Sequence, residues 1–250
     1  MLNIKSILKQ YQPITLSEMD EVALMERVDD KYTISYEELM NILENISSEY
    51  FCLEIDGKRS FTYQTEYLDT IDNLLFKNHQ NGKLNRYKIR FRDYIESKKT
   101  FLEIKFKSNK RVTKKTRMRV PFQEKKITKT CKDFIETKSP YLTKNLDIKV
   151  KNSFDRITLV NLISKERVTL DFNLKFSNPS LGTKSKLDNV GIIEIKREKG
   201  NKKSQLLSIL KRKRIRPTRF SKYTIGSCLL DSNLKYNNFK RKLLFINKLS

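Results

Sequence analysis

Charged side chains, all but one of them Arg or Lys, recur at every second position in three stretches in the middle of the chain. The rows are Arg86, Lys88, Arg90 and Arg92, then Glu103, Lys105 and Lys107, and then Lys115, Arg117 and Arg119. Apolar side chains and a threonine fill the alternate positions, which is the period-2 pattern of a half-buried β-strand. In paired strands these like charges would lie about 5 Å apart, which is destabilising until an anion neutralises them. The rows therefore predict a phosphate-binding sheet face, with a solvated charged face as the alternative.

The charge of the whole chain is consistent with a polyanionic ligand. The 250 residues include 53 Lys and Arg against 29 Asp and Glu, which gives a formal net charge of +24. Such a chain attracts nucleic acid, anionic lipid and polyphosphate alike, so the net charge does not select among them. Arg is the more specific indicator because it makes fixed bidentate contacts with phosphate, and it is concentrated in the rows and at 212–219.

The sequence predicts one globular domain over residues 1–250. Its core is expected at about 20–230, followed by a basic C-terminal helix or tail at 231–250. The three cysteines are widely spaced without a CxxC pair, so we expect buried thiols rather than zinc ligands or disulfides. No apolar run is long enough to span a bilayer, and a cytoplasmic location is the expectation.

Other elements must hold the cationic rows in place. Ser35 and Glu38 form a capping box that predicts a helix over 36–46, and a short helix is expected at about 131–137. Further strands with alternating polar residues are expected at 27–34, 61–67, 154–162, 166–173 and 191–197. About eight antiparallel strands whose polar faces point the same way predict an α+β fold. In it, a closed eight-stranded β-barrel would enclose a polar, cationic lumen, with helices flanking the outside.

Charged residues in these further strands extend the predicted lining. Arg156 lies in one strand, Arg167 shares a face with Asp171, and Glu194 shares a face with Lys196. Glu103 and Asp171 are interpreted as partners that orient cations of their own strand face, Lys105 and Arg167. Glu194 is the better metal candidate, because Mg²⁺ or Mn²⁺ commonly takes one or two carboxylates together with phosphates and waters.

Several segments, taken in chain order, resemble one known family. They are Arg27-Val-Asp-Asp-Lys-Tyr32, Tyr67-Leu-Asp69, His79-Gln-Asn-Gly82, the row at 86–92 with Asp93-Tyr94, Phe101-Leu-Glu-Ile-Lys105, Arg156, Arg167-Val-Thr-Leu-Asp171, Ile193-Glu-Ile-Lys196 and Phe220-Ser-Lys-Tyr223. This order is similar to that of the VTC domain, the polyphosphate polymerase domain of the vacuolar transporter chaperone complex, which also occurs as a stand-alone bacterial protein. Each motif alone is common, but their order and spacing are specific.

The resemblance implies a triphosphate tunnel fold that binds ATP and a growing polyphosphate chain inside the barrel. The implied reaction transfers the γ-phosphoryl group of ATP to polyphosphate and releases ADP. The resemblance assigns Mn²⁺ or Mg²⁺ to Glu194 and the central catalytic cations to Arg90, Arg92, Lys105 and Lys222. Together with the strand pattern, it predicts phosphate contacts from Lys31, Arg86, Lys88, Lys115, Arg117, Arg156, Arg167 and Lys196. Such a transfer depends on fixed cations more than on acid–base groups, so the only histidine, His79, is interpreted as a turn residue before Asn81-Gly82.

Other functions stay open at this point. A triphosphate hydrolase on the same barrel is one, although the first strand has Arg27-x-Asp29-x-Lys31 where such enzymes have Glu-x-Glu-x-Lys. A protein that binds polyphosphate or inositol phosphate without turnover would use the same residues. A specific nucleic-acid module is disfavoured because the aromatic residues of the rows lie opposite the charges. The stretch 239–249 predicts a packed helix, with a membrane-surface helix beside a membrane-associated partner as the alternative.

Overall fold

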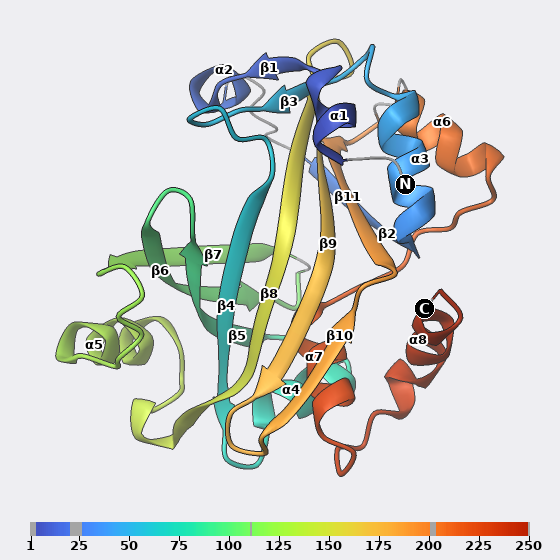
Figure 1. Cartoon of the computed structure of the whole chain (residues 1–250). Coiled ribbons are helices and arrows are strands. Elements are labelled where there is room, and N and C mark those ends of the chain that lie inside the picture. The colour runs from blue at the N-terminus through green and yellow to red at the C-terminus, as the bar shows by residue number, and fades with distance from the viewer. Residues whose placement is uncertain (1–3, 21–26, 111, 201–203, 250) are drawn as a thin grey trace.

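The computed structural model describes residues 4–20, 27–110, 112–200 and 204–249 (Figure 1). A large sheet dominates it, with a main path of strands in the order β2-β11-β9-β8-β4-β5-β6-β7. These strands are β2 (Arg27–Ser35), β4 (Phe61–Thr70), β5 (Arg86–Tyr94), β6 (Lys99–Lys107), β7 (Thr113–Val120), β8 (Leu146–Asn161), β9 (Glu166–Asn178) and β11 (Val190–Glu198). Every ladder along this path is antiparallel. The predicted α+β class with a large antiparallel sheet is confirmed.

Three short strands extend the sheet beyond this path. They are β1 (Gln12–Ile14), β3 (Phe51–Leu53) and β10 (Thr183–Leu187). β1 pairs in parallel with β3, and β3 pairs with β8. β10 pairs antiparallel with the second half of β9, whose first half pairs with β11. The long strands β8 and β9 therefore form the backbone of the sheet (Figure 1).

Eight α-helices and one 3₁₀ helix are found in the described part of the chain. They are α1 (Ile4–Lys9), α2 (Leu16–Asp20), α3 (Tyr36–Asn45), α4 (Leu74–Gln80), α5 (Lys129–Lys138), η1 (Thr143–Asn145), α6 (Gln205–Arg212), α7 (Lys222–Leu230) and α8 (Asn237–Asn247). The predicted helix at 36–46 is confirmed as α3, which begins where the Ser35 hydroxyl accepts a hydrogen bond from the Glu38 amide at 3.1 Å. The helix predicted around 131–137 is α5. No described helix has the length and apolar character needed to cross a membrane.

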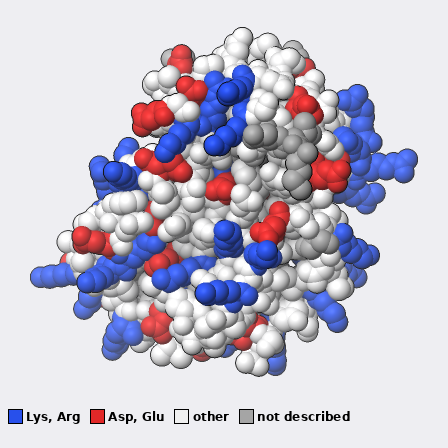
Figure 2. Space-filling view, viewed as in Figure 1, with Lys and Arg blue, Asp and Glu red and all other residues white. Residues whose placement is uncertain are grey.

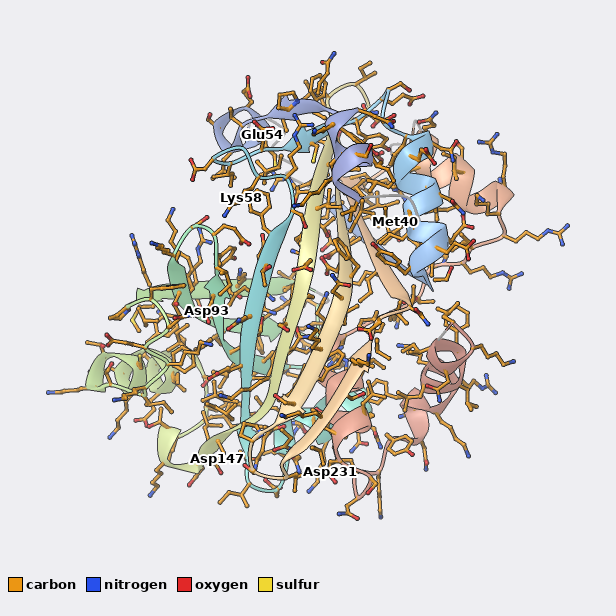
Figure 3. All side chains as sticks on the ribbon, viewed as in Figure 1. Met40, Glu54, Lys58, Asp93, Asp147 and Asp231 are labelled. Atoms are coloured by element: carbon orange, nitrogen blue, oxygen red, sulfur yellow. The ribbon has the colours of Figure 1, made fainter. Side chains whose placement is uncertain are left out.

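In β5 and β11 the apolar side chains point to the outer face of the sheet and the charged side chains point to the inner face. On the outer face, Ile193 and Ile195 of β11 join a buried cluster with residues of α1, α3 and α6, among them Met40 (Figure 3). Ile89 and Phe91 of β5 join a second cluster with α5. The intervening charged residues of these strands must point to the opposite face, because successive side chains of a strand alternate. The outer helices thus fix which face the cationic rows occupy.

Closure of the sheet into a barrel stays a prediction. Among the described residues no ladder joins β2 to β7, so the path ends at these two strands. β2 instead forms hydrogen bonds with the segment between α6 and α7. The Thr218 amide donates to the Lys31 carbonyl at 2.5 Å, and the Thr33 and Thr218 hydroxyls lie 2.8 Å apart. Lys88 of β5 then donates to the Ser221 hydroxyl at 2.8 Å, so residues 218–221 link the two halves of the sheet.

A buried carboxylate anchors α7 to the sheet. Asp69, at the end of β4, accepts hydrogen bonds from the amides of Leu75 and Phe76 at 2.7 and 2.9 Å and from the hydroxyl of Tyr223. It therefore ties the first turn of α4 and the first turn of α7 to the same strand. Lys222, the neighbour of Tyr223, is held against the inner face as a result. C-terminal to α7, α8 packs Phe239 and Ile246 into the adjacent apolar cluster.

Candidate phosphate-binding site

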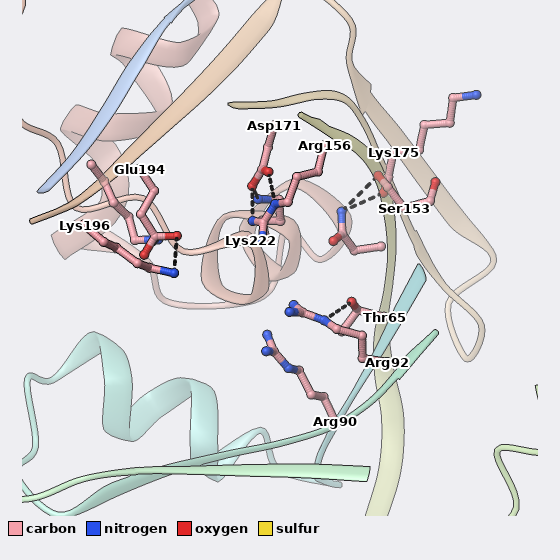
Figure 4. A network of polar contacts seen from close by, with 12 residues as sticks. Thr65, Arg90, Arg92, Ser153, Arg156, Asp171, Lys175, Glu194, Lys196 and Lys222 are labelled. Carbon is pink, nitrogen blue, oxygen red and sulfur yellow. Dashed lines mark hydrogen bonds and ion pairs between the residues drawn. The ribbon is translucent and has the colours of Figure 1, made fainter. Parts of the chain in front are cut away.

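Charged side chains from separate elements converge on the inner face of the sheet. Figure 4 shows Arg90 and Arg92 of β5 directed toward Arg156 of β8, with Glu194 of β11 and Lys222 of α7 beside the same space. These elements lie far apart in the sequence but are brought together by the curvature of the sheet. The site contains three carboxylates, and each of them forms ion pairs with cations. Further cations lie between these ion pairs.

Asp171 of β9 is a buried carboxylate that is held by two cations. It accepts two hydrogen bonds from Arg156, at 2.5 and 2.8 Å, and one from the ammonium of Lys222. Burial by itself would raise the pKa of Asp171, but Arg156 and Lys222 hold that pKa well below its usual range. Burial lowers the pKa of Lys222 to about 8 despite its contact with Asp171. The carboxylate is thus a fixed anion that orients two cations toward the interior.

Glu194 lies between two lysines. Its carboxylate is 3.0 Å from the ammonium of Lys31 and 4.0 Å from that of Lys196. Although burial would raise it, the pKa of Glu194 falls to about 2 because of Lys31, Lys196 and Arg156. The side chain keeps 13% of its surface exposed, so a ligand in the interior can reach it.

Glu103 of β6 holds the third set. Its carboxylate lies 2.8 Å from Nε and 2.6 Å from Nη2 of Arg90, and 2.5 Å from the ammonium of Lys115. Only 1% of the side chain is exposed. Burial opposes ionisation, yet Arg90, Arg92 and Lys115 lower the pKa of Glu103 to about 2. Glu103 and Asp171 do pair with cations, but the predicted partners Lys105 and Arg167 are wrong. The observed partners, Arg90 and Lys115 for Glu103 and Arg156 and Lys222 for Asp171, come from neighbouring strands and from α7.

Some inner-face cations have no carboxylate partner among the described residues. In the portion of the chain that the structure describes, Lys88, Arg92 and Lys105 form no ion pair. Arg92 donates from Nε to the Thr65 hydroxyl at 3.4 Å and is 9% exposed. Burial, followed by repulsion from Lys105 and Arg90, places the pKa of Lys88 well below its usual value. These groups provide positive charge that a bound anion would neutralise.

Lys105 shows how far the sheet curves. Partial burial and repulsion from Lys31 and Arg90 lower its pKa to about 8, although the side chain keeps contact with solvent. Lys31 belongs to β2 and Lys105 to β6, near opposite ends of the strand path. Lys31 lies close enough to Lys105 to lower its pKa although the two strands are near opposite ends of the path, so the sheet is strongly curved.

Several predicted residues lie at the margins of this set. Arg86 donates to the Lys83 carbonyl at 3.0 Å, and burial followed by repulsion from Arg219 lowers its pKa. Arg117 is exposed on β7 and lies 4.8 Å from the ring centre of Phe101. Arg167 of β9 donates to the Met19 carbonyl at 3.0 Å. The side chain of Arg27, part of the first motif, lies outside the described residues.

The interpretation of His79 as a turn residue is wrong. His79 lies in α4, and the chain turns only after it, at Asn81 and Gly82, where Gly82 has φ +67°. Its ring stacks on Phe239 with 6.0 Å between ring centres. Burial and the nearby Lys88 lower the pKa of His79 to about 2, so the ring is neutral at pH 7. Asn-Gly indicated a turn, but Asn and Gly also occur at the ends of helices, as they do here after α4.

Sequence reasoning missed the aromatic side chains on the inner face. The ring of Tyr63 lies 5.1 Å from the guanidinium carbon of Arg156 and stacks on Phe154. Phe154 in turn lies 4.1 Å from the ammonium of Lys222. Such contacts stabilise cations and restrict their rotamers. The alternation of tyrosines in β4 was the available signal, because Tyr63, Thr65 and Tyr67 share one strand face.

A metal ion would depend on the substrate for most of its ligands. The described residues contain no group of three or more His, Cys, Asp or Glu side chains placed to hold a metal. Glu103 and Asp171 are fully engaged by cations, which leaves Glu194 as the carboxylate best placed to share. One carboxylate combined with phosphate oxygens and waters is a donor set that Mg²⁺ and Mn²⁺ accept. The residues present are thus compatible with a metal that binds together with a phosphate ligand.

Comparison with solved structures defines the fold. A proposed adenylyl cyclase from Hippeastrum, reported to have a dominant triphosphatase activity, superimposes with a TM-score of 0.53 and 14% sequence identity, over 85% of this chain and 100% of that one. A proposed adenylate cyclase from Bacillus halodurans gives 0.51 and 15% identity, over 78% of this chain and 94% of that one. At such low identity the likeness shows the fold alone, which is the triphosphate tunnel fold.

The family follows from the sequence itself. The VTC domain model matches residues 26–231, which is most of the chain. The protein therefore belongs to the VTC domain family, as the resemblance predicted. No curated protein matches the chain.

Proposed function

We propose that this protein is a polyphosphate polymerase that transfers the γ-phosphoryl group of ATP to the end of a polyphosphate chain and releases ADP. One observation supports the proposal most directly: Lys88, Arg92 and Lys105 line the inner face of a VTC-domain sheet without carboxylate partners among the described residues. A polyanion would relieve the repulsion among them. ATP and polyphosphate both present the required row of phosphates.

The proposed transfer needs positioning and charge more than proton transfer. A terminal oxygen of the polyphosphate chain forms a new bond to the γ-phosphorus, while the bond from that phosphorus to the β–γ bridging oxygen breaks and ADP leaves with the electron pair. The attacking oxygen is already anionic at neutral pH, so no general base is required. Charge spreads over the phosphoryl oxygens in the transition state, and Arg90, Arg92, Lys105 and Lys222 are the fixed cations proposed to stabilise it.

The remaining inner-face cations are proposed to hold the phosphates on either side of the reacting group. They are Lys31, Arg86, Lys88, Lys115, Arg117, Arg156, Arg167 and Lys196. Asp171 contributes indirectly by fixing Arg156 and Lys222, and Glu103 by fixing Arg90 and Lys115. Orientation of this kind lowers the cost of arranging the cations around each phosphate. We also propose that the sheet and the 218–221 segment together enclose a tunnel.

Glu194 is the residue proposed to hold Mn²⁺ or Mg²⁺. When bound, the metal would neutralise phosphate charge and align the triphosphate. Lys31 and Lys196, which flank Glu194, would then be released to contact phosphate oxygens. Their ion pairs with Glu194 keep all three side chains directed inward before substrate binds.

Triphosphate hydrolysis is the second candidate function. The triphosphatase activity of the structurally similar Hippeastrum protein favours it, because the two chains share a fold. The first strand argues in the other direction, since Asp29 and Lys31 stand in Arg27-x-Asp29-x-Lys31 rather than in the acidic signature of such hydrolases. Hydrolysis differs from polymerisation only in the acceptor, which is water instead of a phosphate chain. A protein that binds polyphosphate or inositol phosphate without turnover is the third candidate function.

The experiment that tests the proposal supplies ATP, Mn²⁺ and a short polyphosphate primer to the purified protein. Polymerisation predicts long chains on a gel and ADP in equal amount to the phosphates added. Orthophosphate without chains would instead indicate the hydrolase. Arg92→Ala should abolish chain formation, whereas Arg241→Ala, an exposed arginine of α8, is the matched control and should retain it.

A further inference from the structure

The outer face of β8, β9 and β10 carries a second set of cations that no helix covers. In Figure 1 these strands and β4 lie in front of the molecule, with α5 to one side and α3 and α6 to the other. Cross-strand pairing places side chains of this face in two transverse rows. One row reads Glu66, Lys151, Ser177 and Lys184, and the next reads Gln64, Ser153, Lys175 and Lys186. Basic side chains are visible over this part of the surface in Figure 2.

These rows belong to the face opposite the candidate phosphate-binding site. Phe176, between Lys175 and Ser177, points to the other side and is buried in the cluster that includes α7. Figure 4 shows Lys175 extending away from the network around Arg156. The lysines of the outer rows therefore cannot share a ligand group with the inner cations, because the sheet lies between them.

The outer rows line a hollow of about 460 Å³ rather than a flat surface. Lys125, from the loop after β7, closes the end next to β4. Its ammonium lies 2.6 Å from the buried Asp93 (Figure 3) and 3.4 Å from Glu66, which also pairs with Lys151 at 3.0 Å. These contacts hold the β4 end of the hollow in a fixed shape. We refer to this hollow as the outer groove.

The other end of the outer groove has uncompensated positive charge. In the described part of the chain, neither Lys175 nor Lys184 forms an ion pair. Lys175 lies directly opposite Lys186 in the β9–β10 ladder, an arrangement of like charges that destabilises a sheet. Lys186 pairs with Asp188 at 2.6 Å, but both side chains are largely exposed, so the pair is weak. An anion across Lys175, Lys184 and Lys186 would remove this repulsion.

The lining of the outer groove selects among anions. It has serine hydroxyls between its lysines, and its one aromatic residue, Phe176, is buried. Stacking platforms for bases are therefore missing from the described lining, which disfavours single-stranded nucleic acid. None of the large exposed apolar side chains belongs to the lining, and the surface is hollow, which disfavours a bilayer. Phosphate groups without bases or acyl chains fit both observations.

We propose that the outer groove binds a segment of inorganic polyphosphate outside the tunnel. The inference rests on the proposed function, because polymerisation is what brings polyphosphate to this protein. A chain held here would stay attached to the enzyme while its end is extended inside. The groove would then raise the local concentration of primer at the inner site.

The test compares two double variants that remove equal charge. Lys175→Gln with Lys184→Gln changes the outer groove, and Lys129→Gln with Lys132→Gln changes exposed lysines of α5 as the control. Binding of tripolyphosphate and of long-chain polyphosphate is measured at several salt concentrations. For the groove variant, the log–log salt dependence of long-chain affinity should become shallower by about 1.4, roughly 0.7 for each lysine. Its affinity at about 50 mM salt should fall more than tenfold, while tripolyphosphate affinity stays equal to that of the control.

The outcomes separate this inference from the proposed function. Equal long-chain affinity of the two double variants, in a protein whose wild type makes polyphosphate, overturns the outer groove alone. Loss of tripolyphosphate affinity in the groove variant also overturns it, because the groove would not be independent of the inner site. Wild-type protein that binds neither ligand overturns both proposals. Groove-dependent binding to phosphatidylserine vesicles, without any effect on long-chain polyphosphate, assigns the surface to a membrane and refutes the inference.

Discussion

Asp171→Asn isolates the contribution of charge inside the sheet, because the side chain keeps its shape and loses only its negative charge. Wild-type Asp171 is 2% exposed and is contacted by both Arg156 and Lys222. The variant would leave two buried cations facing each other without a counter-ion. Removal of one partner from a buried charged set costs about 3 to 5 kcal/mol. For a chain of this size, each kcal/mol lowers the melting temperature by about 2 to 4 °C, so a loss of roughly 6 to 20 °C is expected.

The pH dependence of this loss follows from the two pKa values. The pKa of Asp171 is lowered in the folded state, so its stabilising effect is present above its unfolded pKa of about 3.9 and is lost only as the pH falls through the folded value. At pH 7 the full difference between variant and wild type is therefore expected. Lys222 has a pKa of about 8, and above that pH it loses the charge that Asp171 balances. The difference in melting temperature between Asp171→Asn and the wild type should accordingly shrink between pH 7 and pH 9.

Thermal unfolding with and without tripolyphosphate measures the effect. The anion should stabilise Asp171→Asn more than the wild type, because it supplies the missing negative charge. Asp188→Asn is the matched control, since Asp188 forms an exposed pair with Lys186 and should cost no more than about 1 kcal/mol. The reasoning is refuted if Asp171→Asn melts within the range of this control at pH 7.

Three further predictions concern the ligand. Arg92→Ala should reduce polymerisation at least about 100-fold in the primer assay, the usual cost of losing one transition-state contact, with circular dichroism unchanged; a variant that keeps full rate would remove Arg92 from the site. Glu194→Gln should raise the Mn²⁺ concentration for half-maximal activity about tenfold or more, whereas the exposed Glu198→Gln should not; equal titrations would exclude Glu194 as ligand. Tripolyphosphate affinity should fall as the pH rises through about 8, where Lys105 loses its proton. Calorimetry in buffers of different ionisation enthalpy should show proton uptake on binding at about pH 8. An affinity that does not change with pH in this range would contradict the role of Lys105 in binding phosphate.

Local sequence patterns were enough to predict many of the strands and helices. The alternation of Arg86 to Arg92 with apolar residues placed β5 correctly, because one face of that strand packs on α5 and the other does not. The capping box at Ser35 located α3 for an equally local reason. His79 was assigned to a turn because Asn-Gly occurs both in turns and at helix ends, and the structure shows that α4 continues through His79 before the chain turns.

The sequence by itself determined which strand faces are cationic, since the period of two leaves each side chain only one side of the sheet. The tertiary structure alone decided which cations keep a carboxylate partner. Asp171 contacts Lys222 across 51 positions of the chain, and the curvature of the sheet brings Lys31 near enough to lower the pKa of Lys105. Such pairings depend on strand order and curvature, and both arise from the packing of whole elements. For the same reason, the two lysine rows of the outer groove became visible only when β4, β8, β9 and β10 were placed in register.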